Sequence, residues 1–182
     1  MSLRNKFLSF GLMHFLVGAI AMLCSANTLA AEQSEMDYGE DEAVPIQLQV
    51  TMTKDLAEVA ALSQQNGVPI LLMFSTEDCT FCKSLEAEVL GPMRKAGIDP
   101  KRVILRKVLM DQYDTLRDFS GSKRNAESFA INRGVEIVPT LELVDANGKT
   151  LVPKIVGYQT PGLYGSYLEK AIDTSQYLLE NQ

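Results

Sequence analysis

The sequence has few of the side chains that build metal sites and disulfide frameworks. Its 182 residues include three cysteines, one histidine and no tryptophan. His14 and Cys24 both lie in an apolar N-terminal stretch, so only Cys79 and Cys82 remain in the rest of the chain. A secreted disulfide framework would show several cysteines spread along the sequence. A structural zinc site normally needs four cysteine or histidine ligands, so we expect no metal and no other cofactor.

The sequence also lacks an excess of positive charge. It carries 17 Lys and Arg against 23 Asp and Glu, which gives a formal net charge of −6. The basic residues occur as scattered pairs, whereas binding to a phosphate backbone depends on clustered Lys and Arg. We therefore expect no nucleic-acid partner.

Residues 1–30 have the layout of a secretory signal peptide. Arg4 and Lys6 form a positive head, residues 7–23 are largely apolar, and small residues precede a cleavage point after Ala30. The apolar run is short for a membrane span of about 20 residues, and polar and glycine residues interrupt it. We expect cleavage and export to the periplasm, with an uncleaved membrane anchor as the alternative. Removal of this segment would change the net charge from −6 to −8, because it carries two positive charges and no acidic residue.

The rest of the sequence predicts one domain with a short extension. Residues 31–44 are acidic and poor in apolar side chains, which is typical of a flexible lead-in that cannot form a core. Residues 45–182 are numerous enough to bury one substantial core. We see no internal repeat.

The apolar pattern of this domain predicts strands that alternate with helices, followed by a hairpin. Early strands separated by helices imply parallel pairing, and the turn Asp145–Gly148 favours an antiparallel hairpin. The result is an α/β fold with a central mixed β-sheet and helices on both faces. We predict strands at 46–50, 68–74, 103–110, 140–144 and 149–156, and helices from about 55 to 66, 79 to 90, 122 to 133 and 161 to 173.

Some details follow from individual residues. Residues 111–121 look like a loop, and the pair Gly91-Pro92 should end or kink the helix before it. Arg106 and Lys107 indicate that part of their strand is exposed, and Pro153 places the last strand at an edge of the sheet. The apolar residues expected to face inward from the last helix are Leu163, Tyr164, Tyr167, Leu168, Ala171 and Ile172.

The two remaining cysteines have a spacing that suits redox chemistry. Cys79 and Cys82 stand three positions apart at the predicted start of a helix, so a disulfide between them needs no long-range movement. A helix N-terminus stabilises a thiolate and lowers the pKa of a cysteine thiol below its free value of about 8.5. Cys79 would then attack a substrate disulfide as the nucleophile, and Cys82 would resolve the mixed disulfide. The reverse sequence of steps would oxidise a substrate.

Other interpretations of the pair make different demands. Haem attachment needs a histidine directly after the second cysteine, and Lys83 stands there. A purely structural disulfide stays open, although closing so small a loop removes little chain entropy. In that case the domain would be a chaperone or a partner-binding module rather than an enzyme.

Longer stretches of the sequence resemble the thioredoxin superfamily. The run from Leu71 to Lys83 is similar to that family's central strand, short loop and CxxC-headed helix. Residues 129–135 and 137–141 resemble its helix, glycine and proline-threonine strand entry, and the resemblance spans residues 46–175. The signal peptide and the spacing between CxxC and proline look most like the periplasmic SoxW- and TlpA-type thiol–disulfide oxidoreductases.

This resemblance implies a thioredoxin-like fold, a cis-proline at Pro139 beside the cysteines, and a substrate-binding surface formed by Thr80, Phe81, Val138 and Pro139. The implied substrates are protein or peptide disulfides and dithiols, with a membrane or periplasmic redox partner. The chain departs from thioredoxin at two positions before the first cysteine. Met73 stands where thioredoxin has a buried Asp, and Asp78 replaces the Trp before the first cysteine.

The charges beside the cysteines bear on the direction of electron flow. Neither the Gly-Pro of thioredoxin nor the Pro-His of the oxidant DsbA lies between the cysteines. Glu77 and Asp78 oppose a thiolate at Cys79, whereas Lys83 and the helix terminus favour it. A strong oxidant needs a stabilised thiolate, so the acidic pair favours a reductase.

Overall fold

The computed structural model describes residues 44–112 and 115–181. The predicted signal peptide lies outside the described residues, as do all but the last residue of the predicted acidic lead-in. Among the helices of the described ranges, none combines the length and the apolar composition needed to cross a membrane.

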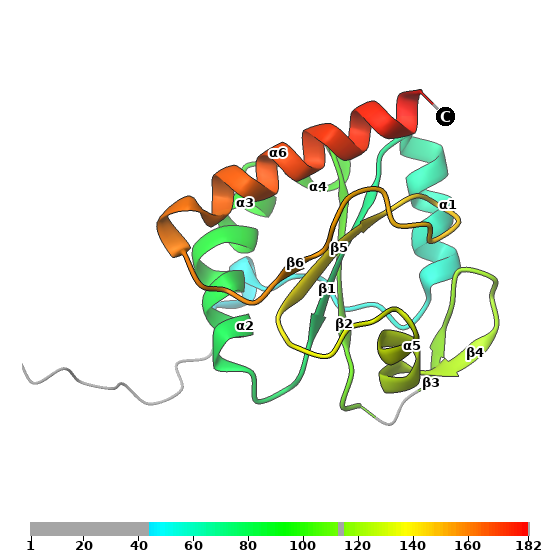
Figure 1. Ribbon diagram of the computed structural model, residues 1–182, viewed down its shortest axis with the longest axis horizontal. Helices are drawn as coiled ribbons and strands as arrows, with labels where there is room; N and C mark the ends of the chain where they lie inside the picture. Colours follow the sequence, from blue (N-terminus) through cyan, green and yellow to red (C-terminus); the bar gives the residue numbers. More distant parts are fainter. Residues whose placement is uncertain (1–43, 113–114, 182) are drawn as a thin grey trace, which may run out of the picture. The chain divides into compact units, whose positions relative to one another are not determined.

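A four-stranded mixed sheet forms the centre of the domain (Figure 1). The strand order is β2-β1-β5-β6, with β1 parallel to β2 and antiparallel to β5. The antiparallel strand β6 lies at an edge of the sheet. A proline such as the nearby Pro153 is tolerated at an edge, because no neighbouring strand there needs its missing N–H group. The predicted fold class is confirmed. The strands are β1 Ile70–Ser75, β2 Ile104–Leu109, β5 Thr140–Val144 and β6 Ile155–Val156.

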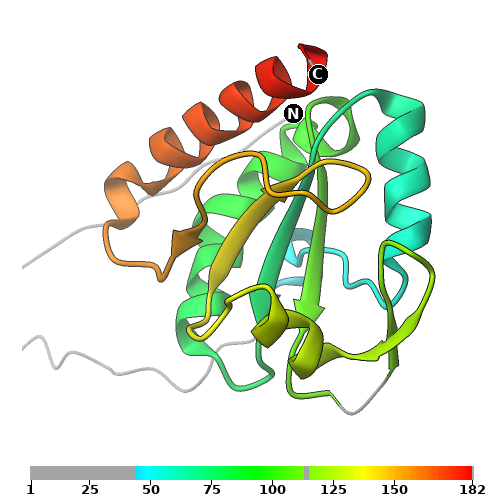
Figure 2. The same ribbon diagram turned by 45° about the vertical axis from the view of Figure 1, so that its right-hand side comes forward.

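Helices cover both faces of this sheet (Figures 1 and 2). Helix α1 (Leu56–Asn66) and helix α5 (Ala126–Asn132) contribute to one apolar core, and helices α2 (Thr80–Leu85) and α6 (Pro161–Glu180) to the other. A short helix α4 (Ile98–Lys101) precedes β2. The two cores lie on opposite faces of the sheet, because successive side chains along a strand point to opposite faces.

Strand β1 is buried along its whole length, which explains its continuous apolar sequence. Leu71 and Met73 belong to the core beneath α2 and α6, while Leu72 and Phe74 belong to the core beneath α1 and α5. Burial of each such side chain contributes about 1.5–3 kcal/mol to folding. This burial holds the strand in place, and with it the start of the loop that follows Ser75.

The helix that starts after Cys79 continues further than the sequence predicts. Helix α2 runs into a π-helical turn η2 (Glu86–Leu90) and then into α3 (Gly91–Lys95). Pro92 has no N–H for the usual bond to the carbonyl four residues earlier, and the wider turn accommodates it. The N–H of Gly91 instead donates to the carbonyl of Glu86, five residues back. The helix is therefore not ended at Gly91-Pro92 but only widened locally, by one π-helical turn.

The segment before α1 is not the predicted strand. Residues Ile46–Leu48 form the 3₁₀ helix η1, and only Met52 makes a bridge to β2, at Lys107. The N–H of Val50 donates to the Glu86 carboxylate at 2.8 Å, so a side chain takes the place of a strand partner.

The predicted loop at 111–121 and the predicted helix start at Ser122 are also wrong. Strands β3 (Thr115–Arg117) and β4 (Lys123–Asn125) form a small hairpin, and Asn125 caps α5 by accepting from the N–H of Ser128. The Asp118 carboxylate closes the hairpin by accepting bonds from Arg124, Ser120 and Ser122. These bonds, led by the one from Arg124, lower the pKa of Asp118 to about 2.

Helix α6 is longer than predicted and buries fewer of the expected side chains. Tyr164, Leu168 and Ile172 are buried, as predicted, but Leu163 and Tyr167 are more than half exposed. The buried positions of α6, which also include Ser175, recur every three or four residues, so the buried face of the helix is narrower than its apolar sequence predicts.

Gly91 provides a test of this packing. A Cβ atom built there would lie 2.6 Å from both the Cβ and the carbonyl oxygen of Leu48. We expect Gly91→Ala to lower the free energy of unfolding by about 1–3 kcal/mol, because the backbone of η1 would have to move. Urea unfolding followed by circular dichroism measures this change.

Gly165 in α6 is the matched control. A Cβ there meets no atom within 4 Å, so Gly165→Ala should stabilise the helix by up to about 1 kcal/mol. Equal effects of the two substitutions would contradict the close contact between η1 and α3.

Candidate active site

Cys79 and Cys82 form a disulfide at the start of α2. The S–S distance is 2.05 Å and the Cα atoms are 5.2 Å apart. Strand β1 ends at Ser75, so only three residues lie between the buried strand and Cys79. The structure therefore places the pair at the carboxyl end of a central strand.

Cys79 is the N-cap of the helix. Its backbone is extended, with φ −83° and ψ 98°, and its Sγ accepts from the N–H of Cys82 at 3.1 Å. The helix continues without a break to Lys95, so its unpaired N–H groups and dipole act at the Cys79 sulfur. A negative charge on this sulfur would be stabilised by the same contact.

The two cysteines differ in exposure. Cys79 is partly exposed, whereas Cys82 is 2 % exposed and packs in the core with Met73 and Leu85. An incoming thiol can therefore reach Cys79 more easily than Cys82. Between them, Thr80 is exposed and Phe81 is 64 % exposed, although Phe81 is a large apolar side chain.

The predicted proline segment reaches the same end of the sheet. Thr140 of β5 pairs with Phe74 of β1, so Pro139 stands beside the end of β1 from which the cysteine loop leaves. The Val138–Pro139 peptide bond is cis. Val138 is partly buried and packs against both cores, and Pro139 is buried.

Two exposed apolar side chains that the sequence analysis did not select flank this proline. Ile137 is 59 % exposed, and Val156 is 52 % exposed and pairs with Thr140 across the β5–β6 ladder. The N–H of Gly157 donates to the Pro139 carbonyl at 2.7 Å, which fixes the proline against β6. The apolar run Ile137-Val138-Pro139, which precedes the predicted strand at 140–144, is the sequence signal that could have revealed this surface.

A buried ionic network fixes the strand that follows the proline. Glu142 of β5 is 1 % exposed and pairs with Arg133 at 2.7 Å, with Thr150 at 2.6 Å and with Lys154 at 3.4 Å. The Arg133 guanidinium also lies over the Phe129 ring. These contacts join the end of α5 to the last hairpin, so they hold both ends of the segment that carries Val138 and Pro139.

A cavity of about 440 Å³ opens beside the disulfide. Its lining includes Cys79, Cys82 and a second buried ion pair, in which the Lys107 ammonium lies 2.6 Å from the Glu86 carboxylate. Glu86 is 3 % exposed. The expectation that Lys107 makes its strand exposed is wrong, because its charge is paired inside the domain. Arg106 is likewise paired, with Asp99.

Tyr158 connects the segment after β6 to the helix of the cysteines. Its hydroxyl donates to Glu88 at 2.7 Å, and its ring packs edge-on against Tyr164. Burial, followed by the bond to Glu88, raises the pKa of Tyr158 to about 12, so the phenol stays a neutral donor at physiological pH.

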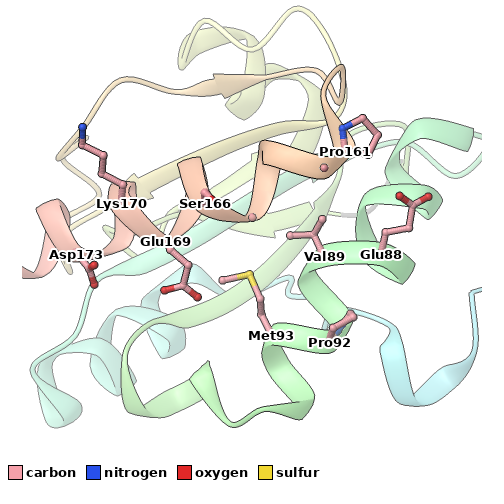
Figure 3. A pocket seen from close by; sticks show the side chains of 11 residues that line it. Glu88, Val89, Pro92, Met93, Pro161, Ser166, Glu169, Lys170 and Asp173 are labelled. Atoms are coloured by element: carbon pink, nitrogen blue, oxygen red, sulfur yellow. The ribbon is translucent and has the colours of Figure 1, made fainter.

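A larger hollow of about 710 Å³ lies elsewhere, between α6 and the helix of η2 and α3 (Figure 3). Figure 3 shows Val89 and Met93 facing Ser166 and Glu169 of α6. Neither cysteine lines this hollow, and its residue Glu169 is paired with Arg102. Across residues 44–112 and 115–181, no cluster of three or more potential ligands could hold a metal ion.

Residues 56–172 match the family model of the thioredoxin-like domain. The chain belongs to this family. The sequence-based recognition of a thioredoxin-fold thiol–disulfide oxidoreductase is thereby confirmed, and the family's cysteine pair is present as a disulfide. Comparison with curated proteins gives no match.

Solved structures are similar to this chain, and the first of those described here shares its fold. A DsbH oxidoreductase is 21 % identical, with a TM-score of 0.51 over 71 % of this chain and 89 % of that chain. Mitochondrial thioredoxin 3 from Saccharomyces cerevisiae, in its oxidised form, is 23 % identical, with a TM-score of 0.46 over 70 % of this chain and 96 % of that chain. Thioredoxin O2 from Arabidopsis thaliana is 23 % identical, with a TM-score of 0.45 over 66 % and 91 %.

Proposed function

We propose that this protein is an exported reductase of protein disulfides. The observation that carries the proposal is the position of Cys79, a partly exposed residue whose sulfur caps a helix and is bonded to the buried Cys82. Cys79 is the nucleophile and Cys82 the resolving residue. The Cys79 thiolate attacks one sulfur of the substrate disulfide and releases the other as a thiolate, and Cys82 then displaces the substrate from Cys79.

The substrate-binding surface consists of Thr80, Phe81, Val138 and Pro139. Phe81, with Ile137 and Val156 near the proline, offers exposed apolar area to a substrate chain. Because most apolar side chains of such a domain are buried, a group of exposed ones at one end of the sheet is typical of a binding surface. Protein disulfides in flexible or partly unfolded segments fit this surface.

Acidic residues beside the disulfide favour the reducing direction. Glu77 and Asp78 are exposed, and the N–H of Glu77 donates to the Asp111 carboxylate at 2.9 Å, which brings a third negative charge near the loop. Negative charge raises the cost of a thiolate at Cys79, and a less stable reduced form is a stronger reductant. The reduced protein should therefore reduce insulin faster than the oxidised protein oxidises unfolded ribonuclease. The opposite ranking would make it an oxidase.

The location follows from the predicted signal peptide. We propose that the domain acts in the periplasm, where a membrane or periplasmic redox partner would supply its electrons. Export gives a mature chain that begins at Ala31, which N-terminal sequencing of the periplasmic fraction checks. A chain that keeps Met1 would favour the membrane anchor.

Replacement of each cysteine separates the two proposed roles. Cys79→Ser should abolish insulin reduction, because no nucleophile remains at the accessible position. Cys82→Ser should also stop turnover but accumulate substrate as a mixed disulfide on Cys79, since the resolving step is blocked. Turbidity of insulin and non-reducing gels measure the two effects. A native protein that reduces no insulin would leave the domain as a binding module with a structural disulfide.

Replacement of Phe81 tests the binding surface. Phe81→Ser should raise the KM for insulin about tenfold, because burial of a phenylalanine contributes about 1.5–3 kcal/mol and 1.4 kcal/mol is a factor of about ten. Reaction with a small aromatic disulfide should change little. Tyr177→Ser is the matched control, since Tyr177 is 65 % exposed and stands near the C-terminal end of α6 (Pro161–Glu180). Figure 1 shows that end of α6 far from the start of α2. Equal KM changes in both variants would argue against a role of Phe81 in binding.

A further inference from the structure

Helix α6 carries a second regular row of side chains besides the one that it buries. The buried Tyr164, Leu168 and Ile172 belong to the core beneath α2 and α6. Another side of the same helix holds a row of exposed residues, separated by four, three, four, three and four positions. They are Leu163, Tyr167, Lys170, Thr174, Tyr177 and, just after the helix, Asn181. We call this row the α6 seam.

The spacing of the α6 seam is that of helices that pair with one another. A period of 3.5 residues keeps one side of a helix against a partner helix, and each side chain of the row enters a hole between four residues of the partner. Leu163, Tyr167 and Tyr177 are 56 %, 58 % and 65 % exposed. Single exposed apolar side chains are common on proteins, whereas an exposed group of them marks a contact surface.

The apolar and polar residues of the α6 seam are arranged symmetrically about its middle. If two α6 helices run antiparallel and meet near Ile172, Tyr167 of each copy lies beside Tyr177 of the other. The same arrangement places Lys170 of each copy beside Thr174 of the other. Aromatic contacts therefore lie on both sides of a polar centre, and the α6 seam is complementary to itself.

The charges near this centre favour the antiparallel direction. Within the described ranges, no acidic side chain pairs with Lys170, and Figure 3 shows Lys170 extending away from Met93 and Glu169. The Asp173 side chain is 66 % exposed, and its Oδ1 accepts from Arg102, which leaves Oδ2 for a second cation. An antiparallel pair brings Lys170 of each copy near Asp173 of the other. A parallel pair would instead bring the two Lys170 side chains together, which like charge disfavours.

The hollow of about 710 Å³ beside α6 gives a second copy room to approach. Neighbouring residues on a helix face are three or four positions apart, so Leu163, Ser166, Tyr167 and Lys170 surround one hole of the α6 seam. Ser166 and Lys170 also line the hollow (Figure 3). In the antiparallel arrangement, Tyr177 of the second copy enters this hole and covers the edge of the hollow.

We propose that two copies of this protein associate through their α6 seams, antiparallel and about a two-fold axis. Such an interface uses the same surface of both copies. A helix of 20 residues is about 30 Å long, so the contact lies at or below the low end of the roughly 1,200–2,000 Å² that specific interfaces bury. We therefore expect a dimer that forms at micromolar concentrations. No residue of the α6 seam lines the cavity beside the disulfide, so both copies keep an accessible Cys79.

Sedimentation velocity of the purified exported protein, from about 1 to 500 µM, measures this association. We expect the dimer fraction to rise with concentration. Tyr167→Glu and Tyr177→Glu should each raise the dissociation constant at least about tenfold, because each places a charge in an apolar contact. Ile131→Glu is the matched control, since Ile131 is 57 % exposed on α5, and it should leave the dissociation constant unchanged.

The substitution Lys170→Gln tests the direction of the pair. The antiparallel arrangement loses the contact between Lys170 and Asp173 at two symmetric places, so the dissociation constant should rise about threefold or more and depend less on salt. In a parallel pair the same substitution would remove a repulsion. Tighter association of Lys170→Gln would therefore overturn the antiparallel arrangement.

Two further results would overturn the inference. One is a native protein that stays monomeric over the whole range, which would leave the α6 seam to a different protein. The other is a dimer whose dissociation constant neither tyrosine substitution changes. Thermal unfolding checks that the variants fold, and Tyr167→Ser and Tyr177→Ser serve where the glutamate variants do not. Insulin reduction by these variants should equal that of the native protein, so the dimer and the exchange chemistry are tested separately.

Discussion

The chemistry of this domain depends on the junction between a fully buried strand and a helix N-terminus. Strand β1 cannot shift, because it packs on both faces, and the short loop after Ser75 leaves little freedom before Cys79. The cap geometry then aims a backbone N–H at the Cys79 sulfur and keeps Cys82 one turn away inside the core. Reactivity is thus obtained from the placement of two sulfurs, without a metal or cofactor being needed for the exchange itself.

Two buried carboxylates support this junction from different directions. Glu142 and Arg133 fasten the proline segment across the sheet, while Glu86 and Lys107 join η2, β2 and the chain at Val50 below the disulfide. Removal of one partner of a buried pair typically costs about 3–5 kcal/mol, so each pair fixes the geometry strongly even where its net contribution is small. The site is therefore bounded by rigid polar contacts on one side and exposed apolar area on the other.

The sequence was sufficient for the strands with continuous apolar runs, the capped helix α1 and the cysteine pair, because local patterns determine them. The sequence was insufficient where the local structure depends on a contact with a residue far away in the sequence. Residues 46–50 read as a strand, but Val50 bonds to a side chain thirty-six residues away. Lys107 was predicted to be exposed, because the sequence does not reveal that its charge is paired with the buried Glu86. Leu163 was predicted to be buried, because helical periodicity shows which face of α6 is apolar but not how much of that face the sheet covers.

The measurement that tests the central claim most directly is a redox titration of the folded protein in dithiothreitol buffers, with alkylation and mass spectrometry to count free thiols. The account predicts one reversible two-electron transition of the Cys79–Cys82 pair at a potential near or below that of thioredoxin, about −270 mV, while circular dichroism shows the fold intact. A disulfide that stays oxidised until the protein unfolds would contradict it.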